Sequence, residues 1–154
     1  MLQFIAMLED NEERVAAMRF VLKQELPTYE IIVFDSAPLF ILWLTDHLIH
    51  TVLICLDHDL GPNRHIDGIH SDPGIGRDVV DYLATQPAIC PVVIHSSNAM
   101  AVPGMLRELR DSNWDCSSVV PSDDTAWIQG DWRKELIRLK ALGLIFSCRS
   151  PEEM

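Results

Sequence analysis

The sequence predicts a doubly wound α/β domain, in which a five-stranded parallel sheet lies between two layers of helices. Two observations support this prediction. Short apolar runs alternate five times with longer segments of helical periodicity, which is the pattern of a parallel sheet whose strands are joined by helices. The apolar runs are nearly continuous, as expected for strands that are covered on both faces. The length of 154 residues suits a single domain of this kind.

Each repeat consists of a strand and the helix that follows it. We expect the strands at residues 3–8, 30–34, 51–56, 91–95 and 117–120. We expect the helices at residues 12–26, 38–47, 75–85, 100–111 and 125–142. These elements form one predicted domain over residues 1–145, which is followed by a C-terminal tail at 146–154.

The first two helices carry the clearest local signals. Asp10 stands at the expected N-cap of the first helix, with Glu13 three residues later as in a capping box. Pro27 ends this helix. The second helix is apolar throughout residues 39–44, so it is either buried on several sides or part of a dimer face. Burial is the commoner explanation.

The longest irregular segment covers residues 61–74 and is rich in Gly, Pro, Asp and His. Loops of this length are usually functional lids or disordered insertions. Because the segment follows the third strand directly, we expect it to lie over the carboxyl edge of the sheet. Open α/β folds bind their ligands at this edge.

Charge and cysteine content exclude several functions. The formal net charge of −11 repels polyanions, and the cations are scattered or gather on the last predicted helix, so we expect no extended nucleic-acid surface. A small phosphorylated ligand remains compatible with this charge, because a bound metal ion supplies positive charge locally. The four cysteines form no C-x-x-C motif, which argues against a zinc or redox site.

Targeting signals are not evident in the sequence. No basic leader precedes the first apolar run, and the longest apolar stretch, at residues 39–44, is too short to span a bilayer. We therefore expect a cytoplasmic location and no membrane partner.

Polar side chains follow three of the predicted strands at the point where each strand ends. Glu9 and Asp10 follow the first strand, Asp-His-Asp at 57–59 follows the third, and His-Ser-Ser-Asn at 95–98 closes the fourth. Because the carboxyl ends of parallel strands share one edge, these side chains are expected to meet. Carboxylates in one pocket repel one another unless a cation is present, and hard oxygen ligands suit Mg²⁺. The sequence therefore predicts a site for Mg²⁺ or Mn²⁺.

Each of these residues also has a purely structural interpretation. Asp10 suits a helix cap, and Asp57 with its neighbours suits a turn before Gly61. His95 is compatible with a core histidine whose ring nitrogens are satisfied. The occurrence of acids at two separate strand ends favours the metal site over these alternatives.

The same residues resemble the receiver domain of two-component response regulators over roughly residues 3–142. The resemblance is carried by Glu9-Asp10 after the first strand, Asp57 after the third and Ser96 after the fourth. It implies a flavodoxin-like receiver fold, with Mg²⁺ held by Glu9 and Asp10. It implies further that Asp57 is the phospho-accepting carboxylate, that Asp59 offers its main-chain carbonyl to the metal, and that Ser96 is the switch hydroxyl.

One position departs from the receiver pattern. Receivers place a lysine just before a proline at the end of the fifth strand, where its ammonium group pairs with the phosphoryl group. The matching segment here, residues 118–121, reads Ser-Val-Val-Pro. A phosphoryl group on Asp57 would therefore lack one of its two main positive partners, which argues against orthodox phosphorelay.

A divergent branch accommodates this departure. The sequence resembles the cyclic-phosphate processing receiver domains, which are proposed to act on cyclic or terminal phosphates of nucleotides or RNA ends. The shared strings are Leu56-Asp57-His58-Asp59-Leu60-Gly61, Gly76-x-Asp78-Val79-Val80-x-x-Leu83, and Ile94-His95-Ser96-x-Asn98 with Met105 beyond it. The first and third strings are more specific than any single carboxylate.

Three functions remain open, and we favour the first slightly. It is a metal-dependent phosphoesterase or binding domain for cyclic phosphates, in which a histidine with a pKa near ~6.5 moves a proton. Its site comprises catalytic Asp57, His58 and His95, phosphate-binding Ser96 and Asn98, and the metal ligands Glu9, Asp10, Asp57 and Asp59.

The other two functions involve a partner protein. One is a stand-alone receiver that is phosphorylated at Asp57 and recognised by a partner. The other is a degenerate receiver that only binds a partner, through the apolar second helix or the helix that contains Trp127 and Trp132. The first function is favoured because the two histidines have no role in phosphorelay.

Overall fold

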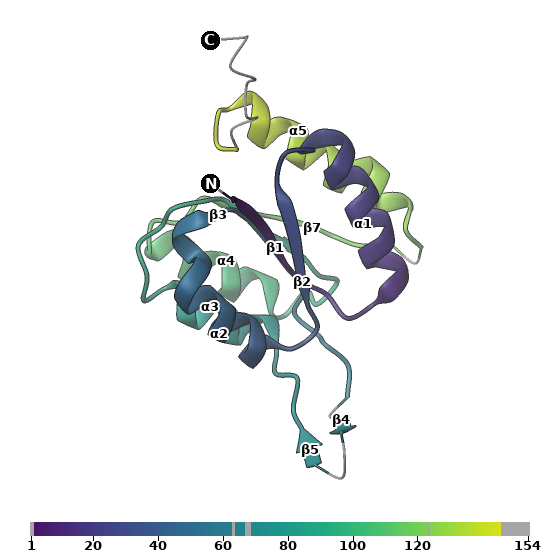
Figure 1. The fold of residues 1–154 in the computed structure, drawn as a ribbon, viewed down its shortest axis with the longest axis vertical. Helices are drawn as coiled ribbons and strands as arrows, with labels where there is room; N and C mark the ends of the chain where they lie inside the picture. The colour runs from purple at the N-terminus through teal and green to yellow at the C-terminus, as the bar shows by residue number, and fades with distance from the viewer. Residues whose placement is uncertain (1, 63, 67–68, 123, 146–154) are drawn as a thin grey trace.

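The centre of the fold is a five-stranded sheet, all parallel, with the strand order β2-β1-β3-β6-β7 (Figure 1). The computed structural model describes residues 2–62, 64–66, 69–122 and 124–145, so the predicted tail at 146–154 lies outside the described residues. The strands are β1 (Phe4–Leu8), β2 (Glu30–Phe34), β3 (Thr51–Leu56), β6 (Val92–His95) and β7 (Cys116–Val119). The doubly wound fold that the sequence predicts is confirmed.

Helices cover both faces of the sheet. The helices are α1 (Glu12–Glu25), α2 (Ala37–His47), α3 (Gly76–Leu83), α4 (Val102–Asp111) and α5 (Arg133–Ala141), with a 3₁₀ turn, η1 (Leu48–His50), after α2. Helices α2, α3 and α4 pack on one face, and α1 and α5 pack on the other (Figure 1).

Alternate residues of each central strand enter different cores. In β1, Ala6 and Leu8 pack in the core beneath α2, α3 and α4, whereas Ile5 and Met7 pack in the core beneath α1 and α5. Because both faces of a strand are buried in such a sheet, every position favours an apolar residue. This explains the continuous apolar runs that identified the strands.

The first helix is capped by Asn11, and the prediction that Asp10 is the cap is wrong. The Asn11 side chain accepts a hydrogen bond of 3.0 Å from the main-chain N–H of Arg14. Either residue type caps well, so the sequence did not distinguish between them. The Asp10 carboxylate therefore does not cap the helix.

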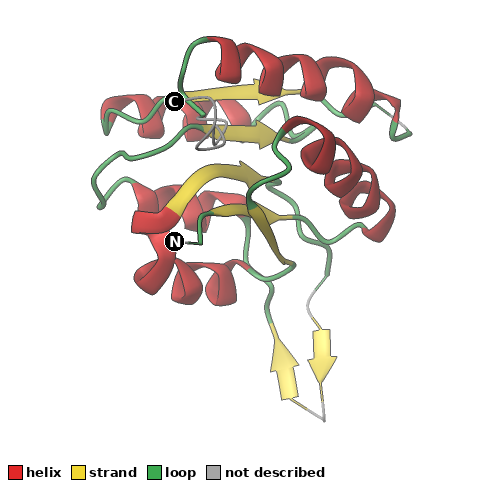
Figure 2. Ribbon diagram, turned by 45° about the horizontal axis from the view of Figure 1, so that its top comes forward, coloured by secondary structure: helices red, strands yellow, loops and turns green. Residues whose placement is uncertain are grey.

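The segment at 61–74 contains a β-hairpin where the sequence predicted an irregular loop. Strands β4 (Arg64–Ile66) and β5 (Ile69–Ser71) pair antiparallel. The hairpin projects away from the body of the domain at the end of β3 (Figures 1 and 2). In this conformation it does not fold back over the sheet.

The last helical segment is continuous in sequence but irregular. A π-helical stretch, η2 (Ile128–Trp132), precedes α5, and Gly130 within it has non-helical dihedral angles. A glycine tolerates such a conformation at little cost. The irregular stretch buries the side chains of Trp127 and Trp132, so these tryptophans do not form the contact face that one hypothesis assigned to their helix.

Helix α2 buries only one side, not several sides as expected. Phe40 and Leu44 are fully buried, whereas Leu39 and Leu42 are 58% and 65% exposed. The exposed pair lies on the outer surface of the domain.

Most cations of α5 are used within the fold. Arg133 Nε and Lys140 Nζ contact the Glu25 carboxylate at 2.9 and 3.1 Å and so tie α5 to α1, and Arg138 pairs with Glu135 on its own helix. Three of the four cations of α5 are thus paired within the domain. Among the helices that the structure describes, none combines the length and the apolar character that a bilayer crossing requires.

Candidate functional site

Strand register brings three functional side chains to one edge of the sheet. Leu8 of β1 pairs with Leu56 of β3, and Leu56 pairs with Ile94 of β6. The next residue on each strand is therefore Glu9, Asp57 or His95, and the three lie side by side. The main-chain ladder extends past the strand ends, since Glu9 N donates to Phe34 O and Asp57 N donates to Leu8 O at 2.9 and 3.0 Å.

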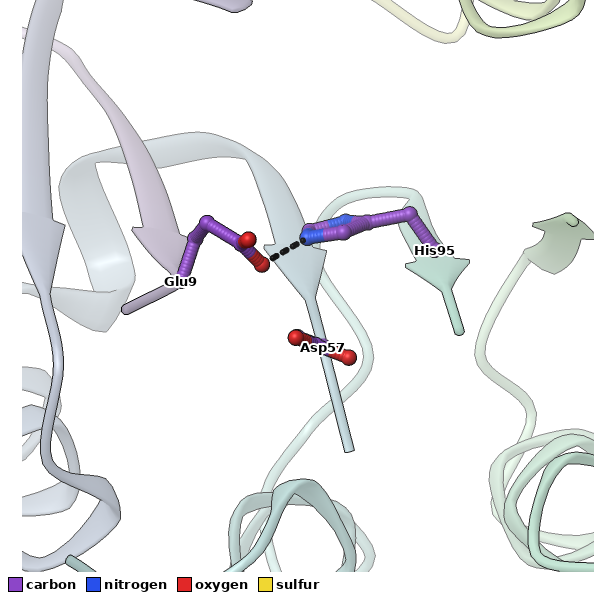
Figure 3. A group of neighbouring side chains, drawn as sticks. All are labelled: Glu9, Asp57 and His95. Carbon is purple, nitrogen blue, oxygen red and sulfur yellow. Dashed lines mark hydrogen bonds and ion pairs between the residues drawn. The ribbon is translucent and has the colours of Figure 1, made fainter. Parts of the chain in front are cut away.

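The three side chains converge in a buried cluster (Figure 3). His95 Nε2 lies 3.0 Å from Glu9 Oε2, and one ligand atom from each of Glu9, Asp57 and His95 lies within 4.8 Å of the other two. Glu9, Asp57 and His95 are 1%, 6% and 0% exposed. We call this group the strand-end cluster.

Burial raises the pKa values of both acids of the strand-end cluster. Burial, followed by the charge of Glu9, raises the pKa of Asp57 to about 7. Burial also raises the pKa of Glu9, against the lowering effects of a hydrogen bond with Asp57 and the Arg14 charge. Below about pH 7 Asp57 therefore holds a proton that a bound cation would displace.

His95 is neutral in this environment. Burial lowers its pKa to about 4, although the Asp57 charge acts in the opposite direction. A neutral imidazole at pH 7 accepts a proton or binds a metal ion, but it is not a general acid. Of the proton-donating and proton-accepting roles predicted for His95, only acceptance is compatible with a neutral ring. Metal binding is a role that was not predicted for His95 from the sequence.

Unsatisfied polar atoms surround the cluster. Glu9 Oε1, His95 Nδ1 and His58 Nδ1 are buried and have no hydrogen-bond partner among the described residues. Buried polar atoms are normally paired, and carboxylate and imidazole groups are the usual ligands of Mn²⁺, Fe²⁺ and Zn²⁺. The donor set therefore fits a divalent cation.

Two predicted metal ligands lie beside the strand-end cluster but not within it. Asp10 is half-buried, and its Oδ2 faces the main chain of Gly61, where a Cβ atom would lie 3.0 Å away. Asp59 is exposed and accepts a hydrogen bond of 3.3 Å from the Asn98 amide. The structure thus groups the side chains of Glu9 and Asp57 with that of His95, and not with those of Asp10 and Asp59. The main-chain carbonyl predicted as the Asp59 ligand stays a prediction.

The remaining predicted residues shape the edge of the sheet. The His58 N–H donates to Asp57 Oδ1 at 2.7 Å, and the Asn98 N–H donates to Ser96 Oγ at 3.1 Å. Asn98 Oδ1 accepts from the N–H groups of Met100 and Ala101. Asn98 therefore orders the turn before α4, which is a structural task that does not require a phosphate.

Gly76, the first residue of α3, lies in close contact with the main chain at the end of β3. Its N–H donates to His58 O at 2.8 Å, and a Cβ atom at this position would lie 2.0 Å from the main-chain oxygen of Asp57. Only glycine allows α3 to start so close to the end of β3. This close approach gives a physical reason for the glycine in the second string of the sequence resemblance.

An open pocket adjoins the acidic residues. It has a volume of about 470 Å³ and lies between α1 and the end of β2, where Glu9, Asp10, Arg19, Phe34 and Asp35 line it. Pockets that hold small molecules typically range from ~300 to ~1,000 Å³. The pocket therefore leaves room for a small molecule beside Glu9.

The sequence of this site matches a known family. Residues 5–111 match the cyclic-phosphate processing receiver domain. The chain belongs to this family. The matching range of the receiver domain runs from β1 to α4 and includes every residue of the strand-end cluster. No curated protein matches the sequence.

Solved structures of response regulators share the fold of this receiver domain. Phosphorylated RcpA, a cyanobacterial phytochrome response regulator, matches with a TM-score of 0.65 at 16% identity, covering 90% of this chain and 94% of RcpA. The Mn²⁺-bound response regulator Rcp1 matches with a TM-score of 0.62 at 17% identity, covering 97% of this chain and 99% of Rcp1. A response regulator receiver domain from Rhodospirillum rubrum matches with a TM-score of 0.66 at 13% identity, covering 96% of this chain and 99% of that domain. At these identities the likeness shows the fold alone.

Sequence reasoning missed one charged residue of the receiver site. Arg14 in the first turn of α1 places its Nη1 3.6 Å from Glu9 Oε1 and 3.9 Å from Asp57 Oδ2. Its position four residues after Asp10, on the helix that leaves the first acidic strand end, is a signal that points toward the site. Arg14 also lies over the Trp127 ring, 5.7 Å from its centroid.

Proposed function

We propose that this receiver domain binds a divalent cation through Glu9, Asp57 and His95, and that the bound cation holds a terminal or cyclic phosphate for hydrolysis. The observation that supports the proposal is the strand-end cluster, in which two buried acids and a buried imidazole offer ligand atoms within 4.8 Å of one another. When bound, a cation would polarise the phosphoryl oxygens and favour attack at phosphorus.

A mixed set of carboxylate and imidazole ligands favours Mn²⁺ over Mg²⁺, which prefers oxygen ligands alone. The Mn²⁺-bound form of Rcp1 supports Mn²⁺ as the first ion to test. Asp10, and the main-chain carbonyl that the family resemblance assigns to Asp59, are candidates for completing the coordination.

The chain's own groups supply the proton chemistry and the space. His95 is neutral at pH 7, with a pKa lowered to about 4 by burial, so it offers a ring nitrogen to the metal ion and carries no proton that the ion must displace. His58 presents a second imidazole next to Asp57, and its Nδ1 is buried without a partner among the described residues. The pocket of about 470 Å³ is lined by Glu9 but not by Asp57 or His95, and we assign the nucleoside part of a cyclic phosphate to it.

The direct test is incubation of the purified domain with Mn²⁺ or Mg²⁺ and a panel of 2′,3′-cyclic nucleotides. We expect hydrolysis or saturable binding by the wild type and loss of both in Asp57→Asn. Asp111→Asn, an exposed acid at the end of α4, is the matched control and should behave as the wild type. Neither turnover nor binding at millimolar ligand would refute the phosphate function.

A second candidate function is phosphorylation at Asp57, which the shared fold with phosphorylated RcpA supports. In this case beryllium fluoride with Mn²⁺ should alter the fluorescence of Trp127, whose ring stacks 5.9 Å from that of His95. A Trp127→Phe variant assigns the signal to this residue. An unchanged spectrum with metal present would argue against phosphorylation.

A further inference from the structure

We propose that Arg14 binds the phosphate directly, so that the positive side chain of this site comes from helix α1. The inference rests on the proposed function and adds to it a residue that no sequence motif identified. A phosphate placed beside Glu9 and Asp57 adds negative charge to a pocket that already contains two acids. It therefore requires a cationic side chain in addition to a metal ion.

Arg14 is placed to supply that charge. Its Nη1 lies 3.6 Å from Glu9 Oε1 and 3.9 Å from Asp57 Oδ2, so the guanidinium faces both acids from beyond hydrogen-bonding distance. Among the described residues, its side chain donates no hydrogen bond. Because a guanidinium has five N–H donors in a planar fork that matches phosphate, Arg14 has donors available for an anion even though its charge faces Glu9 and Asp57.

The surrounding residues hold Arg14 at the mouth of the site. Its guanidinium lies over Trp127 at 5.7 Å from the ring centroid, and Trp127 is itself buried and stacked on His95. The Arg14 side chain is nevertheless 26% exposed, so a ligand can reach it. Trp127 thus connects Arg14 to the strand-end cluster through a fixed aromatic ring.

The end of β7 offers no cation for this task. There the chain reads Val119-Val120-Pro121, and the Val120 side chain is 70% exposed. A lysine at position 120 would therefore not have to displace core residues. This position allows a rescue experiment in which the positive charge is returned from a different element.

The alternative role for Arg14 is to neutralise Glu9 and Asp57 without touching a ligand. The two roles differ in the effect of Arg14→Gln on two binding steps. In both roles the loss of a positive charge near the acids strengthens the binding of Mn²⁺. Only in the proposed role does the same substitution weaken the binding of phosphate to the Mn²⁺-loaded protein.

The experiment is calorimetric titration of Mn²⁺ alone, followed by titration of orthophosphate into the Mn²⁺-saturated protein. For Arg14→Gln we expect Mn²⁺ affinity equal to or above that of the wild type, and phosphate affinity lower by about 10-fold or more, as for the loss of charged hydrogen bonds. Arg14→Lys should lie between the two, because it keeps the charge and loses the fork. Arg107→Gln, an exposed arginine on α4, should match the wild type.

The rescue completes the test. Val120→Lys in the Arg14→Gln background should recover phosphate affinity, whereas Val120→Lys alone should not reduce it. If phosphate affinity is unchanged in both Arg14 variants while Mn²⁺ still binds, the proposal for Arg14 is wrong and the proposed function stands. If the wild type binds no Mn²⁺, the proposed function and this inference are both wrong. If Arg14→Gln does not fold, Arg14→Lys decides the question by the same comparison.

Discussion

The Nε2 atom of His95 lies 3.0 Å from Oε2 of Glu9, although 86 positions separate the two residues in the chain. The contact follows from the register of β1, β3 and β6, which places the residues after Leu8 and Leu56 beside the last residue of β6. Because the contact is buried, both groups have lost their hydrogen bonds to water. Each therefore needs the other group, or a bound ligand, as its polar partner. The site therefore couples stability to binding.

Substitution of His95 should separate these two effects. In His95→Gln, the amide can still donate to Glu9, so we expect nearly wild-type stability but Mn²⁺ affinity lower by at least about 10-fold. In His95→Ala, Glu9 loses its partner, so we expect destabilisation of about 1–3 kcal/mol as well. Thermal unfolding by circular dichroism and calorimetric titration measure the two effects. Wild-type Mn²⁺ affinity in a folded His95→Ala protein would show that His95 is not a ligand.

The affinity for Mn²⁺ should depend on pH through Asp57. Since its pKa is raised to about 7, the metal must displace a proton below that pH. We expect the apparent affinity to rise by up to about tenfold per pH unit toward pH 7 and to level off above it. His95 adds little above pH 5, because its pKa is lowered to about 4. An affinity that does not change between pH 5.5 and 7.5 would contradict this role for Asp57.

The metal-free protein should show the opposite trend in stability. Below about pH 7 the folded state keeps a proton on Asp57 that the unfolded chain releases at its ordinary pKa of 3.8. This contribution is complete at low pH and is lost as the pH rises through the folded-state value, by at most about 1.4 kcal/mol per pH unit. Urea unfolding of wild type and Asp57→Asn, measured between pH 3.8 and about pH 7, isolates this effect as the difference between their free energies of unfolding. A difference that grows in favour of the wild type with rising pH would contradict it.

The close approach of α3 to β3 should make Gly76 intolerant of a side chain. Because a Cβ atom there meets the main-chain oxygen of Asp57 at 2.0 Å, Gly76→Ala should destabilise the domain by at least about 2 kcal/mol. Gly104→Ala is the control within α4, since its Cβ meets only the flexible end of Arg77. Alanine at that position should be neutral or stabilising by up to about 1 kcal/mol. Equal stability of the two variants in urea would count against the geometry at the end of β3.

Sequence periodicity located the sheet because both faces of its strands are buried. The predicted strands at 30–34 and 51–56 coincide with β2 and β3. Local choices were harder to predict. Asp10 and Asn11 are equally good caps by residue type. Which of them caps the helix depends on the residue at which the main chain first becomes helical. The hairpin at β4 and β5 has no clear apolar alternation, so its pairing left no periodic signal.

The site was predictable only in part for a similar reason. Glu9, Asp57 and His95 stand at the ends of strands, and the topology of a parallel sheet brings such ends together. Arg14 and Trp127 reach the site from a helix and from a segment after the last strand, and their approach depends on packing that no short motif encodes. The grouping of Glu9 with His95, and not with Asp10, likewise depends on side-chain direction at the edge of the sheet.

The most direct test of the central claim is calorimetric titration of Mn²⁺ into the wild type, Glu9→Gln and Asp57→Asn at pH 7.5. The strand-end cluster requires one saturable Mn²⁺ site in the wild type and a loss of affinity of at least about 10-fold in each variant, with Asp111→Asn unchanged. If the wild type shows no saturable binding, or if folded Glu9→Gln and Asp57→Asn bind Mn²⁺ as the wild type does, the cluster is not a metal site.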